Sequence, residues 1–238
     1  MTMGWLIPES VKRKIRRRAG AITIHDRLLN LRTCGFNPKQ IIDAGAFHGD
    51  WALLAHGIFP SAQILMIEPQ PQLSGRLKEL CHGNGRLRFH PALLGERHGS
   101  VRFLLQESNS RIVGPDFRAS ASEKVLELPI KPLMDIALAE GFGACEFLKL
   151  DLQGHELAAL AGARPIFGQA EVILCECSWL RIGPVPVAHE VIQTFTAKGY
   201  LLYDVFGFNY RPRDRALWQT DFLFVHERSP LLASRSWD

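Results

Sequence analysis

Two acidic residues that each end an apolar run are the first candidates for chemistry in this chain. Asp43 follows the run 41–42, and Glu68 follows the run 64–67, 25 residues further along. That separation is about one strand–helix–strand unit, and an acid at the end of the second strand is placed to hydrogen-bond a ribose diol. The spacing therefore predicts that the chain binds a nucleoside-containing cofactor.

The turn after Asp43 indicates which cofactor this is. A dinucleotide-binding turn needs G-x-G-x-x-G, and counted from Gly45 the second and third glycines are replaced by Phe47 and Asp50. A bulky ring and a carboxylate obstruct and repel a pyrophosphate. S-adenosylmethionine has no phosphate, and its ammonium and sulfonium suit Asp43 beside the bare backbone of Gly45 and Gly49. The alternative is an ordinary buried strand with a tight turn into a helix.

A second group of polar side chains follows the strand predicted over residues 147–152. Lys149 and Asp151 alternate along this strand, and His155 and Glu156 open the next helix. The C-terminal ends of parallel strands are where α/β folds place chemistry. The alternative interpretation is a solvated strand end followed by a helix. It accounts for Glu156, because an acid stabilises a helix N-terminus. It does not account for Lys149 and Asp151, because charge inside an apolar run must be paired.

Strand-like and helix-like patterns alternate along most of the chain, which predicts a mostly parallel sheet covered by helices on both faces. The last strand follows a short polar loop and is therefore expected to be antiparallel to its predecessor. The predicted strands are 40–43, 63–68, 87–90, 147–152, 172–176, 200–205 and 221–226, and the predicted helices are 51–59, 72–81, 156–163 and 188–198.

We expect three parts along the chain. Residues 1–35 form a helical appendage, residues 36–228 form the main domain, and residues 229–238 form a C-terminal tail. The appendage holds a basic helix around residues 12–18 and a second helix whose start, Thr23 with Asp26, matches a capping box.

Residues 99–130 are expected to be an insertion in the main domain. Two strands, 101–106 and 125–130, flank a polar, Ser-rich segment at 107–123. That segment is either a surface loop or a lid over the substrate, and its position after the third strand favours the lid.

Composition limits the function classes. The 238 residues carry a net charge of +4, and six positive charges lie in the basic helix, so the remainder is not a basic nucleic-acid binder. No apolar run reaches the roughly 18 residues of a membrane span, and the N-terminus lacks the apolar core of a signal peptide. Five scattered cysteines without a C-x-x-C pair agree with a reducing compartment. We therefore expect a cytoplasmic protein.

Six segments, in order over roughly residues 35 to 227, resemble the FkbM-type S-adenosylmethionine-dependent methyltransferases. They are the first motif at Ile41–Asp50, the E-P element at 67–69, the A-L-G turn at 91–95, the serine-rich loop at 108–110, the K-x-D-x-(E/Q)-G-x-E-x-x-x-L-x-G-A motif at Lys149–Ala163, and the closing strand at 219–225. Three positions depart from the family pattern. Phe47 replaces the usual Asn, Gln153 stands where an acid is often seen, and Met134 replaces the first Asp of a Leu-Asp-Asp segment.

The resemblance implies a Rossmann-like class I methyltransferase fold, with a seven-stranded, mostly parallel sheet, an antiparallel last strand and helices on both faces. It implies methyl transfer to a small-molecule acceptor, usually a hydroxyl on a sugar or secondary metabolite. The matched motifs assign S-adenosylmethionine binding to Asp43, Gly45, Ala46, Gly49, Glu68, Pro69, Ala92, Leu93 and Asp151. They assign acceptor binding to Ser108, Ser110 and Gln153.

A hydroxyl acceptor benefits from a base that removes its proton during methyl transfer. The candidates are His155, which titrates near neutrality, and Glu176 at the end of the fifth strand. Asp151 is the third candidate, although it is expected mainly to orient cofactor or substrate. A divalent ion held by Asp151 and Glu176 has no specific ligand spacing to support it, so no metal is assigned.

Two other functions stay open. A methyltransferase acting on RNA or protein would use the basic helix for docking, although the near-neutral remainder and the lack of clustered aromatics argue against RNA. A non-catalytic S-adenosylmethionine-binding module is kept open by Gln153 and opposed by Asp43, Gly45, Glu68 and Asp151. A homo-oligomer is also compatible with the sequence.

Overall fold

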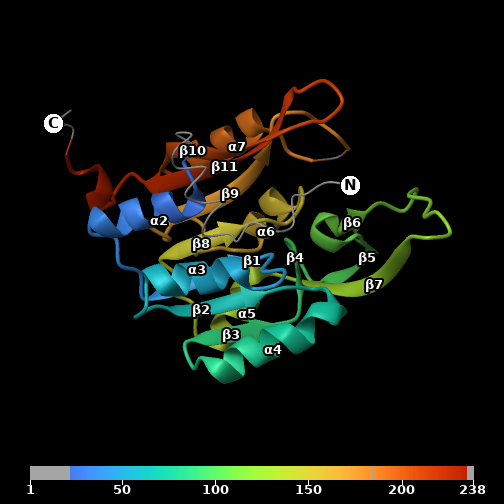
Figure 1. Ribbon diagram of the computed structural model, residues 1–238, viewed down its shortest axis with the longest axis horizontal. Helices are drawn as coiled ribbons and strands as arrows, with labels where there is room; N and C mark the ends of the chain where they lie inside the picture. Colours follow the sequence, from blue (N-terminus) through green and yellow to red (C-terminus); the bar gives the residue numbers. More distant parts are fainter. Residues whose placement is uncertain (1–21, 184, 235–238) are drawn as a thin grey trace, which may run out of the picture.

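The computed structural model describes residues 22–183 and 185–234 and shows a seven-stranded sheet between two layers of helices (Figure 1). Neighbouring strands are parallel except around the last strand, which is antiparallel to both of its neighbours. The predicted fold class is therefore confirmed. The strands lie in the order β10 (Tyr200–Tyr210), β11 (Leu217–His226), β9 (Val172–Ser178), β8 (Phe147–Leu150), β1 (Gln40–Ala44), β2 (Gln63–Ile67) and β3 (Leu87–His90).

Alternating side chains of the strands divide the core between the two faces of the sheet. The first face, which we call the α3 face, is covered by α2 (Ile24–Thr33), α3 (Asp50–Ile58) and α4 (Ser74–Gly83). The second, the α6 face, is covered by α5 (Leu133–Glu140), α6 (Glu156–Ala161) and α7 (Ala188–Thr196). A short 3-10 turn, η1 (Pro71–Leu73), precedes α4. Each face buries one contiguous apolar cluster.

The sequence did not predict α5. Pro132 precedes this eight-residue helix, and Gly141 ends it in the left-handed conformation with φ 79°. Those are recognised start and stop signals. The helix was missed because Leu138 is apolar yet 61% exposed, which blurs the periodicity of so short a segment.

The last two strands are longer than predicted. Both continue beyond the body of the sheet as a hairpin, and their register shifts at three places, two of them adjoining Asn209. Gly207, with φ 66°, and Asn209 are typical strand breakers, so the sequence predicts that the strand ends before them. β-bulges accommodate them instead, and the hairpin reaches the cavity described below.

The insertion supplies three strands of a second, four-stranded sheet beside the main one, at the right of Figure 1. The two predicted strands are confirmed as β5 (Gly99–Leu105) and β7 (Lys124–Lys131), joined by β4 (Leu93–Leu94) and β6 (Arg111–Val113). The segment between β5 and β7 thus contains regular secondary structure: a 3-10 turn, η2 (Glu107–Asn109), comes before β6. The guanidinium of Arg102 donates to the carbonyls of Gly114 and Phe117, which ties the following loop to β5.

At the N-terminal side of the described chain, Thr23 and Asp26 form the predicted capping box of α2. The predicted basic helix at 12–18 lies outside the described residues. After β11 the chain makes a last 3-10 turn, η3 (Pro230–Leu232). None of the helices in the described part of the chain is long and apolar enough to cross a membrane.

Candidate active site

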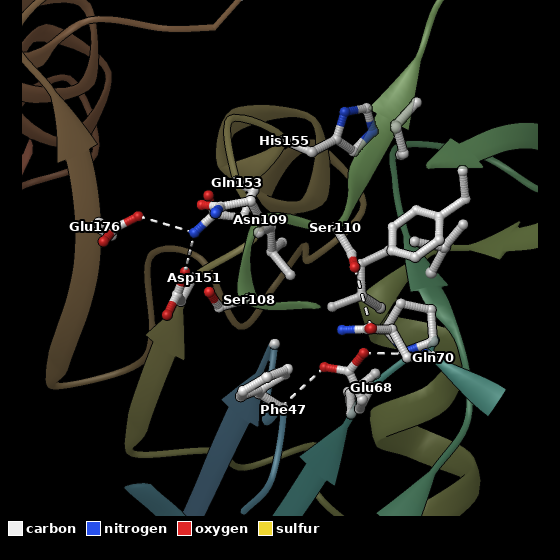
Figure 2. Close-up of a pocket in the computed structure, with 18 of the residues that line it drawn as sticks. Phe47, Glu68, Gln70, Ser108, Asn109, Ser110, Asp151, Gln153, His155 and Glu176 are labelled. Atoms are coloured by element: carbon white, nitrogen blue, oxygen red, sulfur yellow. Dashed lines mark hydrogen bonds between the residues drawn. The ribbon is translucent and has the colours of Figure 1, made fainter. Parts of the chain in front are cut away.

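A cavity of about 350 Å³ lies at the C-terminal ends of the central strands. The ends of β1, β2, β8 and β9 and the η2 segment line it (Figure 2), together with β4, the insertion strands β5 and β6 and the β10–β11 hairpin. Its ionisable lining consists of His155 and the carboxylates of Glu68, Asp151 and Glu176, and none of the described residues lining it is Lys or Arg. The cavity is therefore electronegative.

Most of the residues predicted to form the site line this cavity. Of the predicted cofactor residues, Gly45, Glu68, Pro69, Ala92, Leu93 and Asp151 do so. The predicted acceptor residues Ser108, Ser110 and Gln153 line it as well, and so do the candidate bases His155 and Glu176. The structure places Asp43, Ala46 and Gly49 behind the cavity lining.

Glu68 is held rigidly at one end of the cavity. Its Oε2 accepts a hydrogen bond from the backbone N–H of Phe47 at 2.9 Å, and its Oε1 accepts one from Gln70 at 3.0 Å. The side chain of Phe47 has no polar group that could take the place of the usual Asn. Its backbone N–H, in a residue with φ 48°, orients the carboxylate of Glu68 instead. Burial raises the pKa of Glu68, while the two N–H groups oppose that effect. Each oxygen retains lone pairs for a further donor.

The η2 segment closes the same end of the cavity. Ser110 is buried, and its hydroxyl donates to the carbonyl of Glu107 at 2.7 Å and to the side-chain oxygen of Gln70 at 3.1 Å. The Gln70 amide in turn donates to the Glu107 carbonyl. Ser110 thus joins the insertion to the end of β2, while Ser108 and Asn109 face the cavity (Figure 2).

Asp43 pairs with Lys149 on the adjacent strand instead of facing the cavity. The two residues are directly opposite in the β1–β8 register, and Lys149 Nζ lies 3.0 Å from Asp43 Oδ1 and 3.6 Å from Asp151 Oδ2. Burial lowers the pKa of Lys149, but the two carboxylates outweigh that effect and raise it. Lys149 also donates to the carbonyl of Gly45 and lies over the ring of Trp51. The charge pairing expected inside this apolar strand is confirmed.

Packing explains the two glycines of the first turn. A Cβ on Gly45 would lie 1.9 Å from the carbonyl oxygen of Asp151, so glycine lets the β1 turn approach the β8 loop. A Cβ on Gly49 would lie 2.6 Å from Leu80 of α4, on the side away from the cavity. Both have φ near +80°, which glycine adopts without strain. Their spacing therefore serves backbone packing, and only Gly45 also borders the cavity.

Glu156 organises the loop between β8 and α6. This buried acid accepts hydrogen bonds at Oε1 from the backbone N–H groups of Leu152 at 2.9 Å and Gly154 at 3.1 Å. The loop needs that support because Gln153 and Gly154 both have positive φ, 52° and 96°. Burial raises the pKa of Glu156 to about 7. Glu156 is thus part of the structure that presents Gln153 and His155.

Glu176 lies at the end of β9, in a group of polar residues on the α3 face. Gln153 Nε2 donates both to Asp151 Oδ1 at 3.0 Å and to Glu176 Oε2 at 3.1 Å, so its amide bridges the two acids (Figure 2). Gln219 Nε2 donates to the same Oε2 at 2.9 Å. Burial, followed by repulsion from Asp151 and Asp221, raises the pKa of Glu176 to about 8. No three metal-ligating side chains converge as a metal site among the residues that the structure describes.

His155 lies apart from the bridged acids (Figure 2). Its Nε2 faces the A-L-G turn, 3.6 Å from the position of a Cβ on Gly95. Partial burial lowers its pKa. Among the described residues none forms a hydrogen bond with the His155 ring, whereas the neighbouring Glu156 accepts two backbone N–H groups.

Several cavity-lining residues of the hairpin, of the insertion sheet and of the loop after β2 were missed in the sequence. They include Gln70, Phe103, Ile112, Asn209, Trp218 and Gln219. For Gln219 a signal existed, because strand alternation puts it on the same face as Asp221, opposite the end of β9. For Phe103 and Ile112 the sequence held no signal, because only the insertion sheet brings them to the cavity.

The family model for the methyltransferase FkbM domain matches residues 43–202. No curated protein sequence matches the chain. Solved structures with similarity include precorrin-6y C5,15-methyltransferase from Geobacter metallireducens (11% identity, 94% of this chain and 93% of that chain covered, TM-score 0.44) and a putative O-methyltransferase from Klebsiella pneumoniae (15%, 93% and 92%, 0.43). Aeropyrum pernix fibrillarin, in complex with natively bound S-adenosyl-L-methionine, is a third (13%, 84% and 74%, 0.46). With the family model covering more than half of its residues, the chain belongs to the FkbM methyltransferase family.

Proposed function

We propose that this protein is an S-adenosylmethionine-dependent O-methyltransferase that acts on a hydroxyl of an uncharged small molecule, such as a sugar or secondary metabolite. The observation that carries the proposal is a single cavity that joins Glu68, suited to a ribose, to Glu176, suited to deprotonating an acceptor. Family membership supports methyl transfer, and the acceptor class is inferred from the cavity lining.

The residues present fit the cofactor. Glu68 is fixed by two backbone N–H groups and keeps acceptor capacity for a ribose diol. Asp151 offers a carboxylate to an ammonium, and Leu93, Phe103 and Ile112 provide apolar lining. When bound, S-adenosylmethionine supplies an activated methyl group on its sulfonium. Asp43 and Gly45 act indirectly, through Lys149 and the β8 loop, by fixing the position of Asp151.

Glu176 fits the role of base better than His155. Its carboxylate is anchored by two amide donors, whereas the imidazole has no such anchor. Its pKa, raised to about 8 by burial and neighbouring acids, gives the carboxylate a higher proton affinity than an ordinary Glu. Asp151, bridged to it by Gln153, orients cofactor and acceptor in this proposal.

The cavity lining supports an acceptor without negative charge. Three acids and no described Lys or Arg border the cavity, so it offers no cationic side chain to bind a phosphate or an RNA backbone. Ser108, Asn109, Asn209 and Trp218 offer neutral hydrogen-bonding groups and one aromatic surface for an acceptor. We assign Ser108 and Asn109, which face the cavity, to a wall over the acceptor, while Ser110 fixes the other side of the η2 segment beside Glu68 through Gln70.

Transfer of radiolabelled methyl groups from S-adenosylmethionine tests the proposal. The acceptor panel comprises methyl glycosides, a metabolite extract, total RNA and a peptide mixture, with a Glu176→Gln variant in parallel. Methylation of a neutral hydroxyl compound, at least about tenfold slower in Glu176→Gln, is expected. Transfer only to RNA or peptide, or cofactor binding without transfer to any acceptor, would contradict the proposal.

A further inference from the structure

We propose that Gln219 is a positioning residue for Glu176: together with Gln153 it anchors Oε2 and leaves Oε1 to receive the acceptor proton. The inference rests on the proposed function, because it presumes that Glu176 acts as base. Strand alternation could have placed Gln219 on the face of Asp221, but it did not indicate that two amides meet on one carboxylate oxygen.

The sheet register brings these groups together. Glu176 on β9 is directly opposite Asp221 on β11, and Gln219 is two residues from Asp221, so both face the same side. Gln153 reaches Glu176 from the β8 loop, where its backbone has the unusual positive φ of 52°. The amide nitrogens of Gln219 and Gln153 lie 2.9 Å and 3.1 Å from the same Oε2. Two separate elements therefore fix one oxygen.

This anchoring gives the two oxygens of Glu176 different tasks. Oε2 accepts from two amides, and Oε1 has no hydrogen-bond partner among the described residues of the network. As the acceptor oxygen forms its bond to the methyl carbon, the carbon–sulfur bond breaks and its electron pair stays on sulfur. The hydroxyl proton passes to Oε1, so that Glu176 ends neutral and the amides stay in place.

The amides also balance the charges around Glu176. Asp151 follows β8, Asp221 lies across on β11, and Glu156 opens α6; all three acids favour protonated Glu176, as does burial, while Lys149 opposes them. Hydrogen bonds from the two amides stabilise the ionised carboxylate. Without them, the base would be protonated over a wider pH range.

The test measures the proton affinity of Glu176 directly. Chains labelled with ¹³C at the glutamate carboxyl are titrated by NMR, and the Glu176 resonance is assigned by its loss in Glu176→Gln. In Gln219→Leu we expect the Glu176 pKa to rise by about one, the size of one lost hydrogen bond to a charged group. In Gln219→Glu a further carboxylate should raise it more. Gln193→Leu, on the exposed side of α7, is the control that should leave it unchanged.

The activity arm uses the neutral hydroxyl compound of the acceptor panel that the native chain methylates fastest. The methylation rate should increase with pH in all three chains. The apparent pKa of this increase should be higher in Gln219→Leu than in the native chain or Gln193→Leu, and the rate of Gln219→Leu should recover at alkaline pH. An unchanged Glu176 titration in folded Gln219→Leu and Gln219→Glu would overturn the inference. If no neutral hydroxyl compound is methylated, the proposed function fails, while the NMR titration still decides whether the amides act on Glu176.

Discussion

Replacing Glu156 with Gln should make the protein's stability less dependent on pH. Glu156 is 3% exposed, and burial raises its pKa from 4.5 to about 7. A folded chain that binds a proton more tightly than the unfolded chain is most stable at low pH. The contribution of Glu156 is therefore fully present below about pH 4.5, and it is lost as the pH rises to about 7.

The size of the effect follows from the pKa difference. Each pKa unit corresponds to about 1.4 kcal/mol, so ionisation of Glu156 costs native stability about 3 kcal/mol between about pH 4.5 and about pH 8. The amide introduced by Glu156→Gln is uncharged throughout, and its oxygen can accept the same two backbone N–H groups. The free energy of unfolding of the variant, relative to that of the native chain, should therefore increase with pH and be highest at alkaline pH.

Urea unfolding at a series of pH values from about 4.5 to about 8 measures this difference. Glu176 and Asp221 are partly buried acids with raised pKa and are present in both chains, so only the smaller effect of Glu156 on the pKa of Glu176 differs between them. Glu79→Gln, on the exposed side of α4, should give a curve parallel to that of the native chain. If Glu156→Gln differs from the native chain by the same amount at every pH, the argument from burial is refuted.

Three further predictions concern the cofactor end and the packing beneath it. Glu68→Gln should weaken S-adenosylhomocysteine binding about tenfold to a hundredfold in calorimetry, because a charged acceptor is lost, and an unchanged affinity would contradict its assigned role. Lys149→Met should lower the free energy of unfolding by about 3–5 kcal/mol, because it leaves Asp43 buried without its counter-ion; an unaltered urea midpoint would show the pair to be dispensable. Gly162→Ala should lower the free energy of unfolding by about 1–3 kcal/mol, because the added Cβ would lie 2.1 Å from the Gly95 carbonyl oxygen. Gly83→Ala, with nothing within 4 Å of the new Cβ, is its control, and equal melting temperatures for the two would disprove the close approach.

The alternation of apolar strands and amphipathic helices was readable because it is local. A strand buried on both faces needs an apolar run, and β1, β2, β8 and β9 all contain one near the predicted bounds, broken in β1 and β8 by the paired Asp43 and Lys149. Capping chemistry is equally local, so Thr23 and Asp26 marked the start of α2. What local patterns could not give was the length of β10 and β11, because their bulges at strand-breaking residues are stabilised by pairing between distant segments.

The sequence by itself determined the acids at the strand ends, because parallel topology brings the C-terminal ends of all the central strands to one edge. It thus placed Glu68, Asp151 and Glu176 around one site. Only the tertiary structure decided which partners the acids contact. Asp43 pairs with Lys149, and Gln153 and Gln219 both donate hydrogen bonds to Glu176. Those contacts join residues far apart in the chain, so their geometry depends on strand register and loop backbone, which no local pattern encodes.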